Sequence, residues 1–83
     1  RKINIYTAME QYTYYANMSE EEEKLKKYDF VRIHKGYLVN MAYIQRINKS
    51  NVVLKNSMVL PLSERRYKYV FDSFTSYLAG CSL

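Results

Sequence analysis

The stretch F-V-R-I-H-K-G-Y-L-V-N runs from Phe30 to Asn40. Two short apolar runs in it are separated by His34-Lys35-Gly36, a tripeptide whose charge does not belong in a core. Because successive side chains of a strand point to opposite faces, Val31 and Ile33 are expected to share a buried face. Glycine lets the backbone turn between the runs. The stretch therefore predicts two buried strands joined by a basic corner, although an ordinary solvated turn would read in the same way.

Strand-like patterns extend to both sides of this stretch. Ile3 and Ile5 alternate with Lys2, Asn4 and Tyr6, which predicts a strand with the two isoleucines facing inward. Turn-forming residues at 48–51 and 56–57 separate further apolar runs and indicate an antiparallel meander. Pro61 cannot donate a backbone hydrogen bond, so the last strand is expected at an edge. The strands predicted outside the central stretch are 2–7, 12–16, 42–47, 52–55 and 58–62.

Two helices are predicted. A short one near 20–27 is indicated by a capping box, Ser19 with Glu22, and by glutamates that each precede a lysine by four residues. The acidic run at 20–23 is interpreted as a solvated helix face, with a metal or protein contact as the alternative. A C-terminal helix near 64–79 is indicated by an apolar stripe of helical period, with Ser63 as its N-cap and Gly80 as its stop. The members of that stripe are Tyr67, Val70, Phe71, Phe74 and Leu78.

Size and composition limit the possible functions. The chain of 83 residues makes one domain, and its formal net charge of +5 favours a polyanion or an acidic partner. Cys81 and His34 are the only thiol and imidazole, so a zinc site of four such ligands cannot be completed. One cysteine and one histidine could form a catalytic pair, but Cys81 lies in a C-terminal tail that is expected to fray, so no such pair is expected. No apolar run is long enough for a membrane span. We therefore expect a cytoplasmic protein that is not an enzyme, with no cofactor, metal or membrane contact.

Basic residues follow Ser63 at the start of the predicted C-terminal helix. Arg65, Arg66 and Lys68 lie where the helix dipole is positive, so each exposed cation is unfavourable by about 0.3–1 kcal/mol unless an anion docks there. Free amide groups and guanidinium groups would then converge on one phosphate. The alternative is that both arginines simply reach solvent.

The central motif F-x-R-x-H-x-G-Y-L-V-N and the downstream L-P-L-S at 60–63 together resemble the LytTR-type DNA-binding domain, found mostly at the C-terminus of bacterial response-regulator transcription factors. The resemblance covers residues 1–78. It implies a mainly β fold with minor helix, in which short antiparallel sheets stack into an elongated body and loops enter the DNA grooves. The chain 1–83 would be a single such domain, cut from the C-terminal end of a longer two-component regulator and lacking the family's first strand.

The resemblance also implies site residues. Arg1, Lys35 and Arg65 are expected to contact bases. In the family, the position directly after the L-P-L-S element usually carries a basic residue that contacts a base, but here that position is Glu64. Either Arg65 contacts guanine in its place, or Glu64 itself contacts cytosine. Asn40 is expected to fix a loop. His34 is weighed as a residue that orients the loop or as a phosphate contact. The residues expected to bind phosphate are Lys2, His34, Gly36, Tyr37, Lys55, Arg66 and Lys68.

Double-stranded DNA is the expected partner, with two copies of the domain on a tandem site and an N-terminal regulatory domain outside this chain. Binding would serve transcriptional regulation. The competing hypothesis is a small β-rich protein-interaction module with a basic, Tyr-rich surface that pairs with an acidic partner. Binding of single-stranded RNA by exposed tyrosines is a third alternative, disfavoured because most tyrosines alternate with apolar residues.

Overall fold

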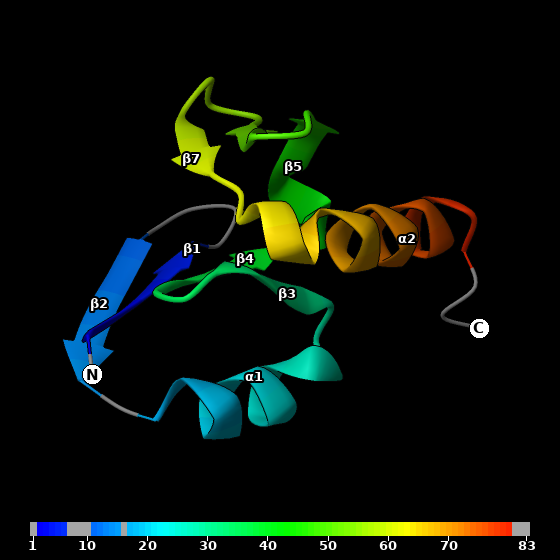
Figure 1. The fold of residues 1–83 in the computed structure, drawn as a ribbon. Coiled ribbons are helices and arrows are strands. Elements are labelled where there is room, and N and C mark those ends of the chain that lie inside the picture. The colour runs from blue at the N-terminus through cyan, green and yellow to red at the C-terminus, as the bar shows by residue number, and fades with distance from the viewer. Residues whose placement is uncertain (1, 7–10, 16, 81–83) are drawn as a thin grey trace.

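The computed structural model describes residues 2–6, 11–15 and 17–80, and of 11–15 it describes the backbone. In the described residues the chain forms two small sheets and two α-helices, whose arrangement is drawn in Figure 1. The elements are β1 Lys2–Tyr6, β2 Gln11–Tyr15, α1 Met18–Lys26, β3 Phe30–His34, β4 Tyr37–Asn40, the 3-10 turn η1 Met41–Tyr43, β5 Ile44–Ile47, β6 Asn51–Leu54, β7 Val59–Pro61, the 3-10 turn η2 Glu64–Arg66 and α2 Tyr67–Leu78.

The strands form a four-stranded sheet in the order β2-β1-β4-β3 and a three-stranded sheet in the order β5-β6-β7. The mainly β class is thereby confirmed, and β5, β6 and β7 form the predicted antiparallel meander. The pairing of β1 with β4 is parallel, whereas the family resemblance implied antiparallel sheets. A pattern of alternating residues predicts a strand, but it does not predict which strand pairs with it or in which direction. The principal extents are 33 × 27 × 27 Å, so the elongation implied by the family resemblance is slight.

The four-stranded sheet is covered on both faces. In Figure 1, α1 lies on one side of it and α2 with the three-stranded sheet lies on the other. On the α1 side, Ile3, Ile5 and Leu38 pack with Met18 of the helix. On the other side, Val31, Ile33 and Val39 belong to a larger cluster. The partners in that cluster from the other elements include Ile44, Val52, Leu54, Val70 and Phe74.

This double cover explains where the alternation rule succeeds and where it fails. Val31 and Ile33 share a buried face, as predicted, and Ile3 and Ile5 are buried as well. Tyr6 was expected to face outward and is instead buried, because β1 is an interior strand with packed residues on each face. Interior strands of doubly covered sheets lose the polar face that the rule presumes.

Helix α1 begins at Met18, and the predicted capping box is wrong. Asn17 is the N-cap, and its Oδ1 accepts a hydrogen bond from the backbone N–H of Glu20 at 3.2 Å. Asn is as good an N-cap as Ser, so the sequence offered two starts two residues apart. The observed start leaves Lys24 beside Glu21 at 3.2 Å and turns Glu22 toward the body of the domain. The interpretation of 20–23 as a solvated face therefore fails at Glu22.

The C-terminal helix is confirmed, with a 3-10 turn at its start. Ser63 occupies the cap position without a side-chain hydrogen bond to the helix, and Gly80 ends it with a φ of 73°. Phe71 and Leu78 were expected in the apolar stripe but are 42% and 65% exposed. Neither helix in the described part of the chain has the length and apolar character needed to span a bilayer.

The segment expected as a strand over 42–47 begins instead as the 3-10 turn η1. Asn40 caps this turn, because its Oδ1 accepts a hydrogen bond from the N–H of Ala42 at 2.9 Å. The predicted loop-fixing role of Asn40 is thereby confirmed. Strand β5 then starts only at Ile44.

Candidate nucleic-acid interface

Lys35 and Gly36 form the tip of the hairpin between β3 and β4. Arg32 holds this tip from one side: its Nε donates to the carbonyl of His34 at 3.3 Å and its Nη2 to the carbonyl of Lys35 at 3.4 Å. On the other side, Asn4 donates its backbone N–H to the carbonyl of Gly36 at 2.7 Å. The backbone of the tip is therefore fixed by hydrogen bonds, while the Lys35 side chain is exposed.

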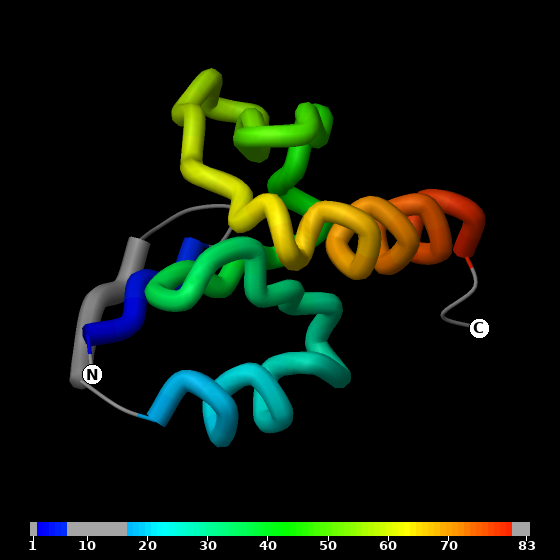
Figure 2. Tube along the Cα trace, viewed as in Figure 1, coloured from blue at the N-terminus to red at the C-terminus, as the bar shows by residue number. Residues whose placement is uncertain are grey.

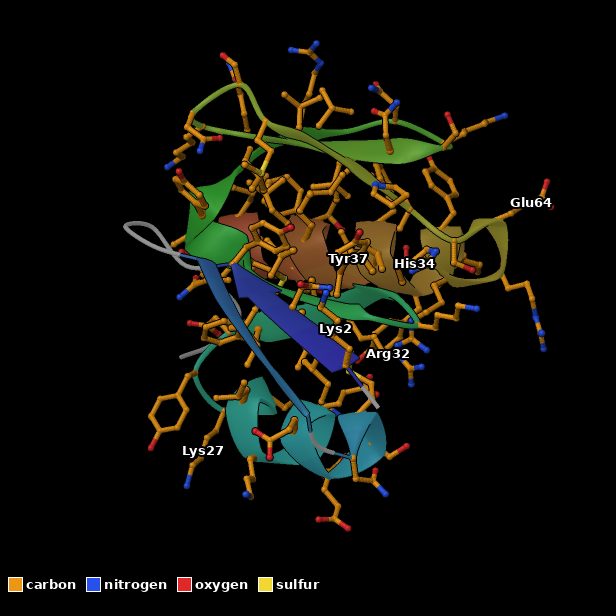
Figure 3. All side chains as sticks on the ribbon, turned by 90° about the vertical axis from the view of Figure 1, so that its left-hand side faces the viewer. Lys2, Lys27, Arg32, His34, Tyr37 and Glu64 are labelled. Atoms are coloured by element: carbon orange, nitrogen blue, oxygen red, sulfur yellow. The ribbon has the colours of Figure 1, made fainter. Side chains whose placement is uncertain are left out.

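A hollow of about 350 Å³ lies on one side of the tip, and we call it the β1 hollow. Figure 3 shows Lys2, His34 and Tyr37 gathered in this region. The rings of His34 and Tyr37 are 5.3 Å apart, and Tyr37 in turn lies 5.8 Å from the ring of Tyr6. Nδ1 of His34 is buried and has no hydrogen-bond partner among the described residues. The hollow is lined by Lys2, Asn4, His34, Lys35, Gly36 and Tyr37.

A second hollow, of about 330 Å³, lies between the hairpin and the start of α2, and we call it the arginine hollow. The chain leading into α2 runs alongside the hairpin here (Figure 2), because the N–H of Ser63 donates to the carbonyl of Ile33 at 2.9 Å. This hollow is lined by Arg32, Lys35, Ser63, Arg65 and Arg66. Lys35 thus borders both hollows, and it shares one of them with Arg65.

The cations around the hollows differ in their partners. Arg66 forms an ion pair with Glu22 at 3.0 Å, and Arg32 lies 3.7 Å from the other oxygen of the same carboxylate. In residues 2–6 and 17–80, by contrast, no acidic oxygen lies within 4.0 Å of the side-chain nitrogens of Lys2, Lys35 or Arg65. These three side chains are exposed, so their charge is available to an anion from solvent.

The structure brings most of the predicted site residues together. Lys2, His34, Gly36 and Tyr37 line the β1 hollow, and Arg65 and Arg66 line the arginine hollow. Lys55 and Lys68 line neither of them, and Lys68 pairs with Asp72 at 3.2 Å on the exposed side of α2. Arg1 lies outside the described residues.

Sequence reasoning missed Arg32, Asn4, Ser63 and Glu22. Arg32 could have been found from its place in the motif, as a charged residue between two buried strand positions. Glu22 had no such signal, since it is one of four consecutive glutamates and its partner lies on a distant segment.

The described residues contain no group of three or more His, Cys, Asp or Glu arranged to hold a metal ion. Exposed cations on a hydrogen-bonded backbone are suited to holding phosphate groups.

Comparison with protein families gives one result that fits this arrangement. A family model described as the LytTr DNA-binding domain matches residues 1–75. Searches of curated proteins and of solved structures gave no match. The matched range covers most of the chain, and it includes both hollows. The chain therefore belongs to the LytTr DNA-binding domain family, whose members bind DNA in transcription regulation.

Proposed function

We propose that this domain binds double-stranded DNA sequence-specifically and reads it through loops. The observation that carries the proposal is that Lys35 and Arg65, which come from different loops, line the same hollow with no acid paired to either of them in the described part of the chain. The β3–β4 tip and the 3-10 turn η2, which carries Arg65, would enter the major groove side by side. A scaffold of short strands would hold both loops in place.

Base contacts are assigned to Lys35 and Arg65, and Arg1, which lies outside the described residues, keeps the same role. Arg65 is preferred over Glu64 because it lines the arginine hollow, whereas Glu64 does not and points outward in Figure 3. A carboxylate facing the phosphates would also weaken binding through like-charge repulsion. A guanidinium fork, by contrast, matches the two acceptors that guanine presents in the major groove.

Phosphate contacts are assigned first to the residues of the β1 hollow, Lys2, His34, Gly36 and Tyr37. Gly36 offers its backbone N–H and Tyr37 its hydroxyl, while Lys2 supplies charge. Lys55, Arg66 and Lys68 are assigned a secondary part in phosphate binding. Arg66 already pairs with Glu22, Lys68 with Asp72, and Lys55 lies outside both hollows.

The wider setting of the domain is also proposed. Two copies would occupy a tandem site, each placing its hairpin tip in one major groove. A regulatory domain, such as the receiver of a bacterial two-component system, would lie N-terminal to this chain. The organisation implied by the LytTR-type motifs supports both parts of this proposal.

The test is a titration of labelled duplex DNA, single-stranded DNA and RNA, preceded by selection of a preferred duplex from a random pool. We expect tight binding to one selected duplex and weaker binding to a scrambled one. With about five phosphate charges neutralised, by Lys2, Lys35, Arg65, Arg66 and one of Lys55 and Lys68, the logarithm of the binding constant should fall against the logarithm of salt with a slope of about −4 to −5. A slope near zero, or equal binding to all duplexes, would show that the proposal is wrong.

The assignment of Arg65 is tested with Arg65→Ala on the selected and scrambled duplexes. Loss of a bidentate base contact should reduce discrimination by about 1–3 kcal/mol. Arg46→Ala is the matched control, because Arg46 is an exposed arginine on β5 that lines neither hollow. Equal losses of discrimination in the two variants would show that Arg65 does not contact a base.

A further inference from the structure

We propose that Glu22 of α1 is a positioning residue that fixes the distance between the two DNA-facing loops, and that it thereby sets sequence discrimination rather than the affinity for DNA of any sequence. The inference rests on the proposed function, since it concerns how the loops carrying Lys35 and Arg65 are aligned. Glu22 itself is not assigned a contact with DNA.

The first step concerns the backbone carbonyls of β3 that accept hydrogen bonds from the segment before α2. In the described sheet β3 is an edge strand, so its outer backbone groups need partners from elsewhere. The carbonyl of Arg32 accepts from Nε of Arg66 at 2.9 Å, and the carbonyl of Ile33 accepts from the N–H of Ser63 at 2.9 Å. The loop that carries Arg65 is therefore attached to β3 through the residues on either side of it.

The second step is that the same strand fixes the hairpin tip. The next two carbonyls, those of His34 and Lys35, accept from the guanidinium of Arg32 at 3.3 and 3.4 Å. Four consecutive carbonyls are thus bound by two guanidinium groups and one amide. The relative placement of the Lys35 and Arg65 segments therefore depends on the side chains of Arg32 and Arg66 together with the backbone hydrogen bond from Ser63 to Ile33.

The third step is that Glu22 holds both arginines. Its Oε2 lies 3.0 Å from Nη2 of Arg66, and its Oε1 lies 3.7 Å from Nη1 of Arg32. The three side chains are only 19–29% exposed, so water screens these contacts less than it would on an open surface. Without the carboxylate the two guanidinium groups would repel each other. Arg66 would still have its contact with the ring of Tyr69, whose centroid lies 5.0 Å from the guanidinium carbon.

The expected consequence falls on base reading because hydrogen bonds to base edges weaken steeply with distance and angle. Phosphate contacts depend mainly on charge and tolerate small shifts of a loop. Removing the carboxylate also removes a negative charge close to the duplex. Glu22→Gln should therefore weaken binding to the selected duplex while binding to a scrambled duplex stays unchanged or becomes tighter.

The experiment compares Glu22→Gln with Glu23→Gln, which makes the same change of charge at an exposed neighbour on the same helix. Dissociation constants for selected and scrambled duplexes are measured for each variant. We expect the ratio of the two constants to fall about tenfold in Glu22→Gln, which is the loss of one base contact, and to stay at the wild-type value in Glu23→Gln. An unchanged ratio in Glu22→Gln, or an equal fall in both variants, would overturn the positioning role.

Arg66→Lys provides a second variant that keeps the net charge. A lysine cannot donate to the carbonyl of Arg32 and to Glu22 with the fork of a guanidinium. We expect the same fall in discrimination with an unchanged salt slope. Nε–Hε signals of Arg32 and Arg66, followed by NMR in the free protein, should lose protection against exchange in Glu22→Gln; retained protection at both sites would contradict the proposal.

These outcomes separate the inference from the proposed function. If the wild-type domain selects no duplex, the proposed function fails and the positioning role fails with it. If the wild type selects a duplex and Glu22→Gln selects it equally well, the proposed function stands and only the role of Glu22 is wrong.

Discussion

Glu22 and Arg66 are 44 residues apart in the sequence, yet Oε2 of Glu22 lies 3.0 Å from Nη2 of Arg66. This ion pair joins α1 to the 3-10 turn that precedes α2. The four-stranded sheet separates these helices elsewhere, so the contact connects the two layers at the edge of the sheet, beside β3. It lies directly next to the arginine hollow, which Arg66 lines.

A double-mutant cycle with Glu22→Gln and Arg66→Gln should show a coupling of about 1 kcal/mol in the free energy of unfolding, measured with urea. The reason is partial burial, since the two side chains are 23% and 29% exposed. The control is the cycle for Lys68 and Asp72, whose side chains are 88% and 60% exposed and whose coupling should be about 0.3–0.5 kcal/mol. A coupling for Glu22 and Arg66 no larger than the control would mean that the pair does not stabilise the fold.

The fold could be predicted from the sequence wherever local pattern determines local structure. The alternation around Val31 and Ile33 gave the correct faces of β3, and Gly80 marked the end of α2 correctly. The predictions failed where tertiary packing overrides the pattern. Tyr6 is buried because β1 lies inside a doubly covered sheet, and no periodicity within 2–6 carries that information.

The site could be predicted in part for the same reason. The motif and the charge pattern pointed to Lys35 and Arg65, and both residues line the arginine hollow. Neither pattern contains the ion pair between Glu22 and Arg66, because a pair separated by most of the domain leaves no local trace in one sequence. For this reason the sequence predicted that the Arg66 side chain is available to a phosphate, whereas in the structure it forms an ion pair with Glu22.

Lys35→Ala should weaken binding to every duplex and reduce the salt slope by about 1, because one cation that releases a counterion is lost. It should also reduce discrimination if the side chain reads a base. Lys27→Ala is the control, since Lys27 is exposed, lines neither hollow and lies far from His34 in Figure 3. Titrations at several salt concentrations give both slopes. Equal slopes for Lys35→Ala and the wild type would place Lys35 outside the DNA contact.

Gly36→Ser should leave the fold intact and strengthen DNA binding. A Cβ at this position would lie 3.7 Å from the carbonyl of Lys2 and 3.9 Å from Nδ2 of Asn4, which are ordinary contacts. The added hydroxyl could donate to a phosphate, and one such hydrogen bond is worth about 0.5–1.5 kcal/mol. Gly36→Ala, which adds the Cβ without the hydroxyl, should match the wild type in melting temperature and in affinity. A large loss of stability in Gly36→Ala would show that the tip requires glycine.

Tyr6 should make stability depend on pH in the alkaline range. Burial raises the pKa of its phenol, and the neighbouring Tyr37 raises it further. The native state therefore holds this proton more tightly than the unfolded state, whose tyrosines titrate near pH 10. The resulting stabilisation is complete below about pH 10 and is lost as the pH rises through the folded-state pKa. Urea unfolding between pH 8 and pH 11 should show a shallower decline in Tyr6→Phe than in the wild type. Tyr28→Phe is the control, because it makes the same chemical change at a tyrosine that is 60% exposed. Identical slopes for Tyr6→Phe and the wild type would mean that the buried phenol is not the group that couples folding to pH.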